Sequence, residues 1–283
     1  MIVHCTKPRS EQGELCTCSD CTYSSPLGAR MAFMTISAHP AWPYPFWIAH
    51  RGAGKLAPEN TLAAFRLGAS HGWRMFECDA KLSRDGVLFL LHDDTLERTS
   101  NGQGIAGEQR WAALSQLDAG AWHSRQYAGE PLLTLERLAH WCLANHLLLN
   151  LEIKPSPDTD AATGEAVAQA VARLWQGQPV MPLLSSFSTT ALHAARRAAP
   201  ALPRALLLEA LPPDWLTQAR ALDCMAVVAE HTLWNAETVD AANAAGLRAL
   251  SYTVNDAAEA DRLMALRTDG IITDRVDFFS PAA

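Results

Sequence analysis

The sequence predicts a closed (β/α)8 barrel with a small inserted subdomain near residues 93–131. From Trp47 onward, short apolar runs alternate with helical patterns almost to the end of the chain. Such sustained alternation is typical of a parallel sheet covered by helices, and about eight units suggest a closed barrel. The length of 283 residues, 49% of them hydrophobic, allows one large domain with a sizeable core. A doubly wound open sheet is the structural alternative.

Each expected strand is a short apolar run, and most of the runs are followed by a helical pattern. The strands are expected at residues 47–49, 75–80, 87–91, 147–153, 182–186, 205–208, 225–229, 248–254 and 270–273. The helices are expected at residues 61–71, 135–145, 161–175, 189–198, 214–221, 236–245 and 257–266. The first helix has clear boundary signals, because Asn60 or Thr61 can cap its N-terminus and Gly72 can end it.

One interval breaks this alternation. Residues 93–131 are rich in Gly, Ser, Asn and Gln, and they carry Trp111, Trp122 and Tyr127. A segment of this length inside a compact domain is usually functional or forms a subdomain. In a barrel it would cover the carboxyl-terminal face, where active sites lie.

Composition and charge exclude some classes of binding partner and indicate the cellular compartment. A formal net charge of −7 argues against a general nucleic-acid binder and against a protein held stably on anionic membranes. No apolar run approaches the roughly 18 to 20 residues of a membrane span, and the first residues lack the apolar segment of a secretory signal. We therefore expect a cytoplasmic protein; its oligomeric state is not predicted.

The cysteines fall into two groups. The first 21 residues hold Cys5, Cys16, Cys18 and Cys21, whereas Cys78, Cys142 and Cys224 are isolated in apolar surroundings. An odd, scattered set favours a reducing compartment over a disulfide framework. We expect residues 1–40 to be an extension that is disordered or precedes the true start of translation, with a small zinc site as the alternative. Residues 41–283 are expected to form the barrel domain.

Two common motifs match the sequence in the wrong context. Residues 102–107 fit G-x-G-x-x-G, but a dinucleotide-binding loop must follow a strand and open a helix. Residues 68–72 fit the G-x-S-x-G pattern of serine hydrolases, but Ser70 stands at the end of an expected helix instead of between a strand and a helix. We assign neither motif a function.

Charged side chains occur where the expected strands should be most apolar. They are His50 and Arg51 after the first strand, Glu77 and Asp79 in the second, His92 after the third, and Glu152 and Lys154 in and after the fourth. Alternate residues of a strand point to the same side, so Glu77 and Asp79 share a face, as do Glu152 and Lys154. Near the carboxyl ends of neighbouring strands, these groups could converge on one site.

The chemistry of this set points to a metal-assisted reaction. Each member alone could be a rim pair, a solvated edge or a turn contact, but repeated charge on apolar strands requires partners. Three carboxylates on one face need a cation, and oxygen ligands suit Mg²⁺ or Ca²⁺. Two histidines are suited to acid–base catalysis, and Arg51 and Lys154 to an anion. Together they suggest metal-assisted hydrolysis of a phosphate ester.

At these residues the sequence resembles the glycerophosphodiester phosphodiesterase family. The resemblance rests on HRG at 50–52, PENT at 58–61, ECD at 77–79, LHD at 91–93 and LEIKP at 151–155. Later segments that also resemble the family are SF at 186–187, YTVN at 252–255 and DGIITD at 269–274. The resemblance extends from about Trp42 to the C-terminus, and the bacterial cytoplasmic form is the closer match.

The resemblance implies a TIM barrel that hydrolyses glycerophosphodiesters, such as glycerophosphocholine and glycerophosphoethanolamine, to an alcohol and sn-glycerol 3-phosphate. It implies His50 and His92 as the acid–base pair, Glu77, Asp79 and Glu152 as ligands of one divalent ion, Mg²⁺ or Ca²⁺, and Arg51 and Lys154 as phosphate contacts. It implies that Glu59 supports either the metal or the loop at residues 50–51.

The reaction order and the substrate leave alternatives. We favour His50 as the base and His92 as the acid, and either water or the glycerol 2-hydroxyl could attack. One rival is an enzyme of the same fold acting on lysophospholipids, since Trp111 and Trp122 could accommodate a headgroup or an acyl chain. A more remote rival is a barrel that only binds its ligand.

Overall fold

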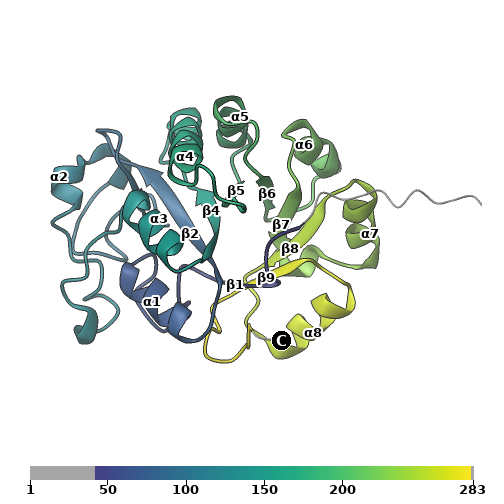
Figure 1. Cartoon of the computed structure of the whole chain (residues 1–283), viewed down its shortest axis with the longest axis horizontal. Helices are drawn as coiled ribbons and strands as arrows, with labels where there is room; N and C mark the ends of the chain where they lie inside the picture. The colour runs from purple at the N-terminus through teal and green to yellow at the C-terminus, as the bar shows by residue number, and fades with distance from the viewer. Residues whose placement is uncertain (1–41, 282–283) are drawn as a thin grey trace, which may run out of the picture. The chain divides into compact units, whose positions relative to one another are not determined.

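Parallel strands close into a ring in the computed structural model, which describes residues 42–281 (Figure 1). In chain order the ring contains β1 (Trp47–Ala49), β2 (Met75–Leu82), β4 (Leu148–Ile153), β5 (Leu183–Ser186), β6 (Arg204–Leu208), β7 (Ala226–Glu230), β8 (Arg248–Tyr252) and β9 (Gly270–Thr273). Strand β1 pairs in parallel with both β2 and β9, so the sheet has no open edge there. The predicted closed barrel is confirmed, and the open doubly wound sheet is wrong.

Helices cover the outside of this ring (Figure 1). They are α1 (Leu62–Ser70), α3 (Leu135–Ala144), α4 (Asp160–Leu174), α5 (Thr189–Ala198), α6 (Trp215–Ala221), α7 (Ala236–Ala244) and α8 (Ala257–Ala265). Each falls within one residue of the expected ends. Helix α1 is capped by Thr61, whose hydroxyl accepts from the backbone N–H of Ala64 at 3.3 Å.

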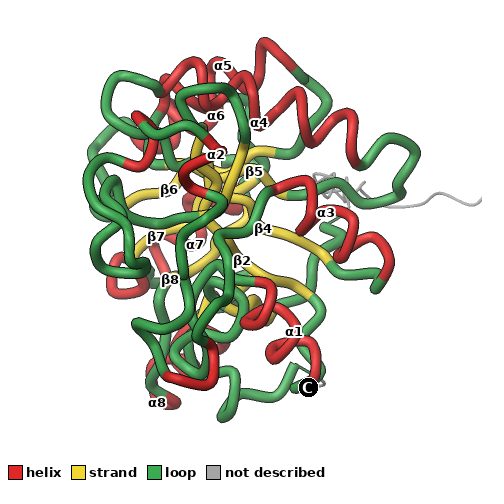
Figure 2. Tube along the Cα trace, turned by 90° about the vertical axis from the view of Figure 1, so that its left-hand side faces the viewer, coloured by secondary structure: helices red, strands yellow, loops and turns green. Residues whose placement is uncertain are grey.

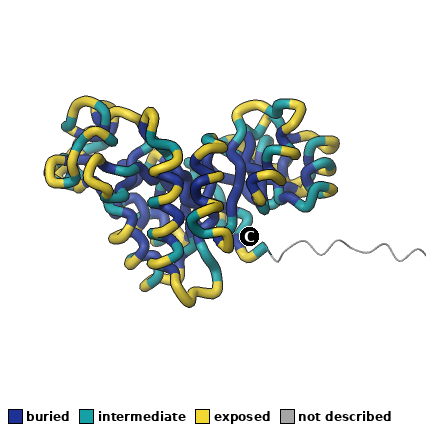
Figure 3. The backbone as a smooth tube through the Cα atoms, turned by 90° about the horizontal axis from the view of Figure 1, so that it is seen from above, coloured by how far each residue is buried: buried dark blue, intermediate teal, exposed yellow. Residues whose placement is uncertain are grey.

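Strand alternation divides the core into two apolar clusters. Along β4, Leu149, Leu151 and Ile153 pack against the helices in the larger cluster. The interior of the barrel holds a smaller cluster that includes Ile48 and Met75. In Figure 3 buried residues gather toward the centre of the molecule and exposed residues lie on its outer turns. Because the intervening β4 residues Asn150 and Glu152 face inward, the barrel interior can carry a polar site.

The insertion between β2 and α3 is longer than predicted. It contains β3 (Leu88–Leu90), α2 (Trp111–Leu114) and two short 3₁₀ turns, and Figure 2 shows it mostly as loops and turns. Strand β3 pairs antiparallel with the end of β2, so the run at 87–91 is a strand outside the ring. The chain therefore leaves the barrel after residue 82 instead of near residue 93. The insertion has an apolar cluster of its own, which includes Phe89, Leu96 and Leu114.

The N-terminal extension and its zinc alternative lie outside the described residues. Within residues 42–281, Cys78, Cys142 and Cys224 are buried free thiols, and burial raises the pKa of each. None of the helices in this part of the chain has the length and apolar character needed to cross a membrane.

Candidate active site

Three buried carboxylates meet at the carboxyl-terminal part of the barrel. Glu77 and Asp79 come from β2 and Glu152 from β4, and one oxygen of each lies within 4.8 Å of the others. The register of β2 against β4 brings these carboxylates together, because Asp79 is the Cα partner of Glu152. Burial and the neighbouring carboxylates raise the pKa of Glu77, and burial with Asp79 raises that of Glu152 to about 7. The predicted acidic set is therefore one cluster in which like charges repel.

Asp79 is held by one oxygen only. Its Oδ2 accepts from Asn60 Nδ2 at 2.8 Å, and its backbone N–H donates to Asn60 Oδ1 at 3.2 Å. Although burial opposes ionisation, Arg51, His92 and Lys154 keep the pKa of Asp79 below its ordinary value. Its buried Oδ1 has no hydrogen-bond partner among the described residues. This orphaned oxygen beside two further carboxylates fits a hard divalent cation, as the donor set predicts.

His50 is oriented by a residue from the far end of the chain. Its Nδ1 lies 2.7 Å from Asp274 Oδ1, directly after β9. Asn255 fixes that carboxylate by donating from Nδ2 to Asp274 Oδ2 at 2.9 Å and accepting from the Asp274 backbone N–H at 2.9 Å. The other ring atom, Nε2, lies 3.7 Å from Glu77 Oε2. A carboxylate at Nδ1 selects the tautomer whose Nε2 is free to take a proton.

His92 reaches the same site from the insertion. Its Nδ1 lies 2.7 Å from Asp93 Oδ1, and its Nε2 lies 3.1 Å from Lys154 Nζ. Lys154 also donates to Glu152 Oε1 at 2.9 Å. Burial lowers the pKa of His92 below its ordinary value, which favours the neutral imidazole in this arrangement. The two predicted histidines thus line one cavity, His50 from the loop after β1 and His92 from the insertion.

Arg51 occupies the loop after β1 in a left-handed conformation, with φ of +50°. Its backbone N–H donates to Glu77 Oε2 at 3.1 Å, and its Nη1 donates to Glu59 Oε1 at 2.8 Å. Its Nε lies 3.4 Å from Asp79 Oδ2. Of the two supports expected from Glu59, the structure places this carboxylate on Arg51.

A cavity of about 170 Å³ in the mouth of the barrel is lined by six of these residues: His50, Arg51, Glu77, His92, Glu152 and Lys154. Asn150, the Cα partner of Glu77, also lines it, and neither polar atom of its buried amide has a partner among the described residues. The aromatic lining consists of Phe187 and Tyr252, whose rings meet edge to face with centroids 5.8 Å apart. Phe187 also lies 5.5 Å from Lys154 Nζ.

The two tryptophans that could accommodate a headgroup or an acyl chain lie outside this cavity. Trp111 packs against Phe89 in the cluster of the insertion, with ring centroids 6.1 Å apart. Trp122 is exposed, and its indole N–H donates to the carbonyl of Ala119. Neither lines the cavity. An aromatic residue in an insertion can equally serve the core of that insertion, as Trp111 does.

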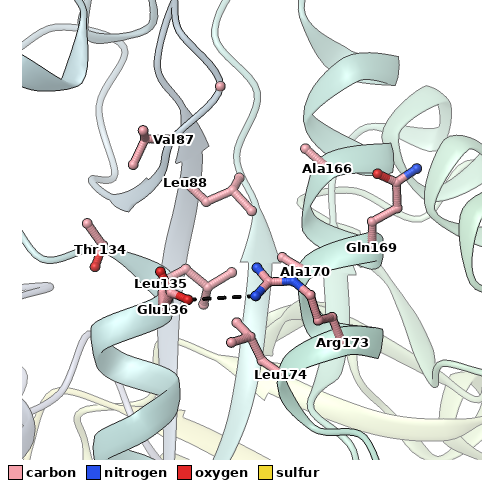
Figure 4. A pocket seen from close by; sticks show the side chains of 11 residues that line it. Val87, Leu88, Thr134, Leu135, Glu136, Ala166, Gln169, Ala170, Arg173 and Leu174 are labelled. Atoms are coloured by element: carbon pink, nitrogen blue, oxygen red, sulfur yellow. Dashed lines mark ion pairs between the residues drawn. The ribbon is translucent and has the colours of Figure 1, made fainter.

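A larger hollow, of about 550 Å³, lies on the outer wall of the barrel (Figure 4). It lies between the turn before β3, the start of α3 and one face of α4. Its polar side chains include Glu136 and Arg173, which approach within 3.7 Å of each other. It contains no histidine and no cluster of carboxylates, so it offers none of the chemistry gathered at the barrel mouth.

The two motifs set aside from the sequence have structural explanations. Ser70 is exposed at the end of α1 and donates to the carbonyl of Leu67. Gly68 lies against the loop of His50, because a Cβ there would meet the carbonyl oxygen of Gly52 at 2.2 Å. The glycines at 102–107 lie in the insertion, where Gly104 adopts φ of +85° in a turn. Neither segment contributes a lining residue to the barrel cavity.

Four residues of the site or its surroundings received no role from the sequence, although two of them lie in segments that resemble the family. Asn255 and Asp274 lie in segments that resemble the family, but only closure of the ring brings them to His50. Arg98, whose contacts are described below, lies in the insertion, and Asn150 stands two residues before Glu152 on the same strand face.

Comparison with known proteins agrees with this geometry. Residues 50–278 match the model of the glycerophosphoryl diester phosphodiesterase family. A glycerophosphodiester phosphodiesterase of Caldanaerobacter subterraneus subsp. tengcongensis is 31% identical, over 80% of this chain and 93% of the relative. Another from Bacillus subtilis is 30% identical, over 82% of this chain and 84% of the relative.

A solved structure shows the same fold. An Oleispira antarctica phosphodiesterase, in complex with the product sn-glycerol-3-phosphate, superposes with a TM-score of 0.76 and 33% identity. The match covers 81% of this chain and 93% of that chain.

Proposed function

This chain belongs to the glycerophosphoryl diester phosphodiesterase family, and we propose that it hydrolyses small glycerophosphodiesters with the help of one divalent cation. Membership makes it a phosphoric diester hydrolase. The substrates that we propose are glycerophosphocholine and glycerophosphoethanolamine, cleaved to an alcohol and sn-glycerol 3-phosphate. The observation that carries this proposal is the pair of carboxylate-oriented histidines, His50 and His92, in one cavity with a buried acidic cluster.

Glu77, Asp79 and Glu152 would hold the cation, which we propose to be Mg²⁺ or Ca²⁺. When bound, the ion supplies positive charge for the phosphodiester oxygens and for charge that develops during the reaction. It also relieves the repulsion among three carboxylates that lie within 4.8 Å of one another. The unpaired Asp79 Oδ1 supports this role, because a buried oxygen without a partner is costly.

Arg51 and Lys154 are the proposed phosphate contacts. Both line the cavity, and each is held by carboxylates that leave other donor atoms available. A guanidinium carries five donors in a planar fork that matches phosphate oxygens, and an ammonium adds a point charge. Holding the phosphate between them sets the position of its two ester oxygens relative to the histidines.

His50 is the proposed base and His92 the proposed acid. Asp274 leaves the Nε2 of His50 free to take a proton from water or from the glycerol 2-hydroxyl as that oxygen attacks phosphorus. Attack by water gives sn-glycerol 3-phosphate directly, whereas attack by the 2-hydroxyl first gives a cyclic phosphate, whose bond from phosphorus to the 2-oxygen water must then break. Because the neutral His92 keeps its proton on Nδ1, its Nε2 must first receive one; as the bond from phosphorus to the alcohol oxygen breaks, that proton moves from Nε2 to the alcohol oxygen. Lys154, whose Nζ lies 3.1 Å from this nitrogen, can supply a proton to Nε2.

We propose further that residues 41–283 form the single catalytic domain, working on a small-molecule substrate in the cytoplasm. The three buried free thiols support a reducing compartment. Fractionation of cells that express the full chain would test this placement: recovery with periplasmic or membrane markers would contradict it.

A glycerol 3-phosphate release assay tests the activity directly. Glycerophosphocholine, glycerophosphoethanolamine and lysophosphatidylcholine are compared with and without a chelator. We expect release from the first two, loss with the chelator, and recovery with added Mg²⁺ or Ca²⁺. Turnover of lysophosphatidylcholine alone would favour the lysophospholipid alternative, and binding without turnover would favour the non-catalytic one.

A further inference from the structure

The Arg98 guanidinium joins two loops that carry residues of the proposed site. Its Nε and Nη2 donate to the two oxygens of Asp93 at 2.6 and 2.8 Å. Its Nη1 and Nη2 donate to the two oxygens of Glu59 at 2.7 and 2.8 Å. Arg98 therefore engages two carboxylates at once, each in the bidentate arrangement that suits a planar guanidinium.

Each of these carboxylates also contacts a residue of the proposed site. Asp93 Oδ1 lies 2.7 Å from the Nδ1 of His92, and Glu59 Oε1 accepts from the Nη1 of Arg51 at 2.8 Å. A continuous series of hydrogen bonds thus runs from the His92 ring through Asp93, Arg98 and Glu59 to Arg51. It connects the insertion to the loop after β1.

The segment around His92 needs such an anchor. His92 follows β3, and residues 92–100 form turns and bends with one isolated β-bridge, from Thr95 to Ile105. Within residues 42–281 its ring nitrogens have hydrogen-bond partners only in Asp93 and Lys154. The hydrogen bonds from Arg98 are the main cause that lowers the pKa of Asp93, so this carboxylate stays ionised and accepts the Nδ1 proton.

The exposure of Arg98 limits what its ion pairs contribute to the stability of the protein. Arg98 has a side-chain exposure of 43%, and isolated surface pairs contribute little to stability. Here four short bonds converge from one guanidinium on two carboxylates that are 13% and 27% exposed, and one of those carboxylates orients an imidazole. The expected effect of removing Arg98 is therefore on the position of that ring.

We propose that Arg98 is a positioning residue for His92, tethering Asp93 to Glu59 so that Nε2 of the imidazole faces the cavity. The inference rests on the proposed function, in which a proton leaves that nitrogen for the departing alcohol oxygen. Without the tether, Asp93 is free to turn away and the ring loses its alignment. Arg51 still contacts Glu59 and Asp79, so substrate binding changes less than turnover.

The test uses two substrates that differ in their need for a proton. Departure of ethanolamine from glycerophosphoethanolamine requires protonation, whereas p-nitrophenolate leaves the p-nitrophenyl ester of glycerol 3-phosphate without it. In the metal-supplied full chain, Arg98→Met should lower kcat on the first substrate by about 30-fold and on the second by less than about threefold, with KM nearly unchanged. Arg98→Lys, which keeps the charge without the bidentate fork, should fall between.

Controls separate positioning from folding. Arg125, an exposed arginine of the same insertion, has no side-chain hydrogen bond or ion pair among the described residues, so Arg125→Met should leave both activities unchanged. Circular dichroism and the Tm check that each variant folds. If Arg98→Met lowers kcat equally on both substrates, or leaves it unchanged, Arg98 does not position the acid and the inference is overturned.

A double variant distinguishes this inference from the proposed function. His92→Ala alone should show the same dependence on the leaving group, and equal losses on both substrates would overturn the assignment of His92 as the acid. Arg98→Met added to His92→Ala should then cause no further loss of kcat, whether His92 acts as the acid or as the base. A further loss in that background would show that Arg98 acts through another residue.

Discussion

The Nδ1 of His50 lies 2.7 Å from Asp274 Oδ1, although the two residues are 224 positions apart in the chain. Closure of the ring explains their contact, because β1 pairs with β9 and each residue directly follows its strand. The carboxylate accepts the Nδ1 proton, which leaves Nε2 without a proton on the side of Glu77. The barrel thus sets the tautomer of the proposed base through a residue from its last strand.

Asp274→Asn should therefore disable turnover without unfolding the barrel. An amide can present its NH₂ group to Nδ1 and stabilise the wrong tautomer, so kcat should fall by about 100-fold or more. Steady-state glycerol 3-phosphate release measures the loss. The matched control is Asp277→Asn, since Asp277 is exposed and pairs with Arg275 at 3.4 Å. Equal activity of the two variants would contradict the role of Asp274.

The strand and helix positions were predictable because apolar periodicity follows burial directly. The exception is the run at 87–91, which lies outside the ring. Leu90 packs into the main cluster, whereas Phe89 and Leu91 pack into the cluster of the insertion. A strand buried on both faces reads as a continuous apolar run, so the sequence cannot distinguish it from a barrel strand.

The site was predictable where its residues interrupt apolar strands, as Glu77, Asp79 and Glu152 do. Asp274 and Arg98 could not be assigned in this way. Both stand in polar loops, where charge is ordinary, and their partners are set by ring closure and by the path of the insertion. Sequence spacing carries no information on such contacts, even within a segment that resembles a family.

Ionisation of Glu77 and Glu152 should lower the stability of the metal-free protein as the pH rises from about 4.5 to 7, whereas the lowered pKa of His92 acts in the opposite direction. The pKa of folded Glu152 is about 7, above its ordinary 4.5, and that of Glu77 is raised as well. The unfolded chain therefore releases protons first, and the stability that these groups contribute below pH 4.5 is lost as pH approaches 7. The shift of Glu152 alone corresponds to about 3 kcal/mol.

Thermal melts of the chelator-treated protein between pH 4.5 and 7.5 measure this loss. Glu152→Gln cannot ionise at that position, so its Tm should fall less steeply over the same range. Saturating Mg²⁺ or Ca²⁺ should flatten the curve of the wild-type chain. A metal-free Tm profile that runs parallel for the wild-type chain and Glu152→Gln would contradict the repulsion that we infer among the carboxylates.

Metal affinity should increase with pH over the same interval. The cation and the protons compete for Glu77 and Glu152, so binding releases protons. If one proton with a pKa of about 7 is displaced, affinity should fall by up to about tenfold per unit below pH 7. Calorimetric titration with Mg²⁺ or Ca²⁺ in buffers of different ionisation enthalpy measures affinity and proton release together.

Two variants locate that binding. Glu77→Gln should weaken binding by at least about tenfold, since one charged ligand is lost. Glu136→Gln, on the outer wall away from the cluster, should bind as the wild-type chain does. Affinity that is independent of pH and unaffected by Glu77→Gln would place the ion elsewhere.

Gly68→Ala should damage the site from inside a helix. A Cβ at this position would approach the Gly52 carbonyl oxygen to 2.2 Å and the Phe76 ring to 2.6 Å, so the loop after His50 must move. We expect a loss of turnover of at least about tenfold, because small misplacements of catalytic groups are costly, together with a lower Tm.

Ser70→Ala, in the same G-x-S-x-G segment, removes only an exposed hydroxyl bonded to Leu67, so its activity and Tm should stay at wild-type values. The opposite pattern, with Ser70→Ala inactive and Gly68→Ala active, would indicate a serine nucleophile and contradict the proposed site. The pair thus tests whether this motif serves chemistry or the close packing of α1 against the loop that carries His50.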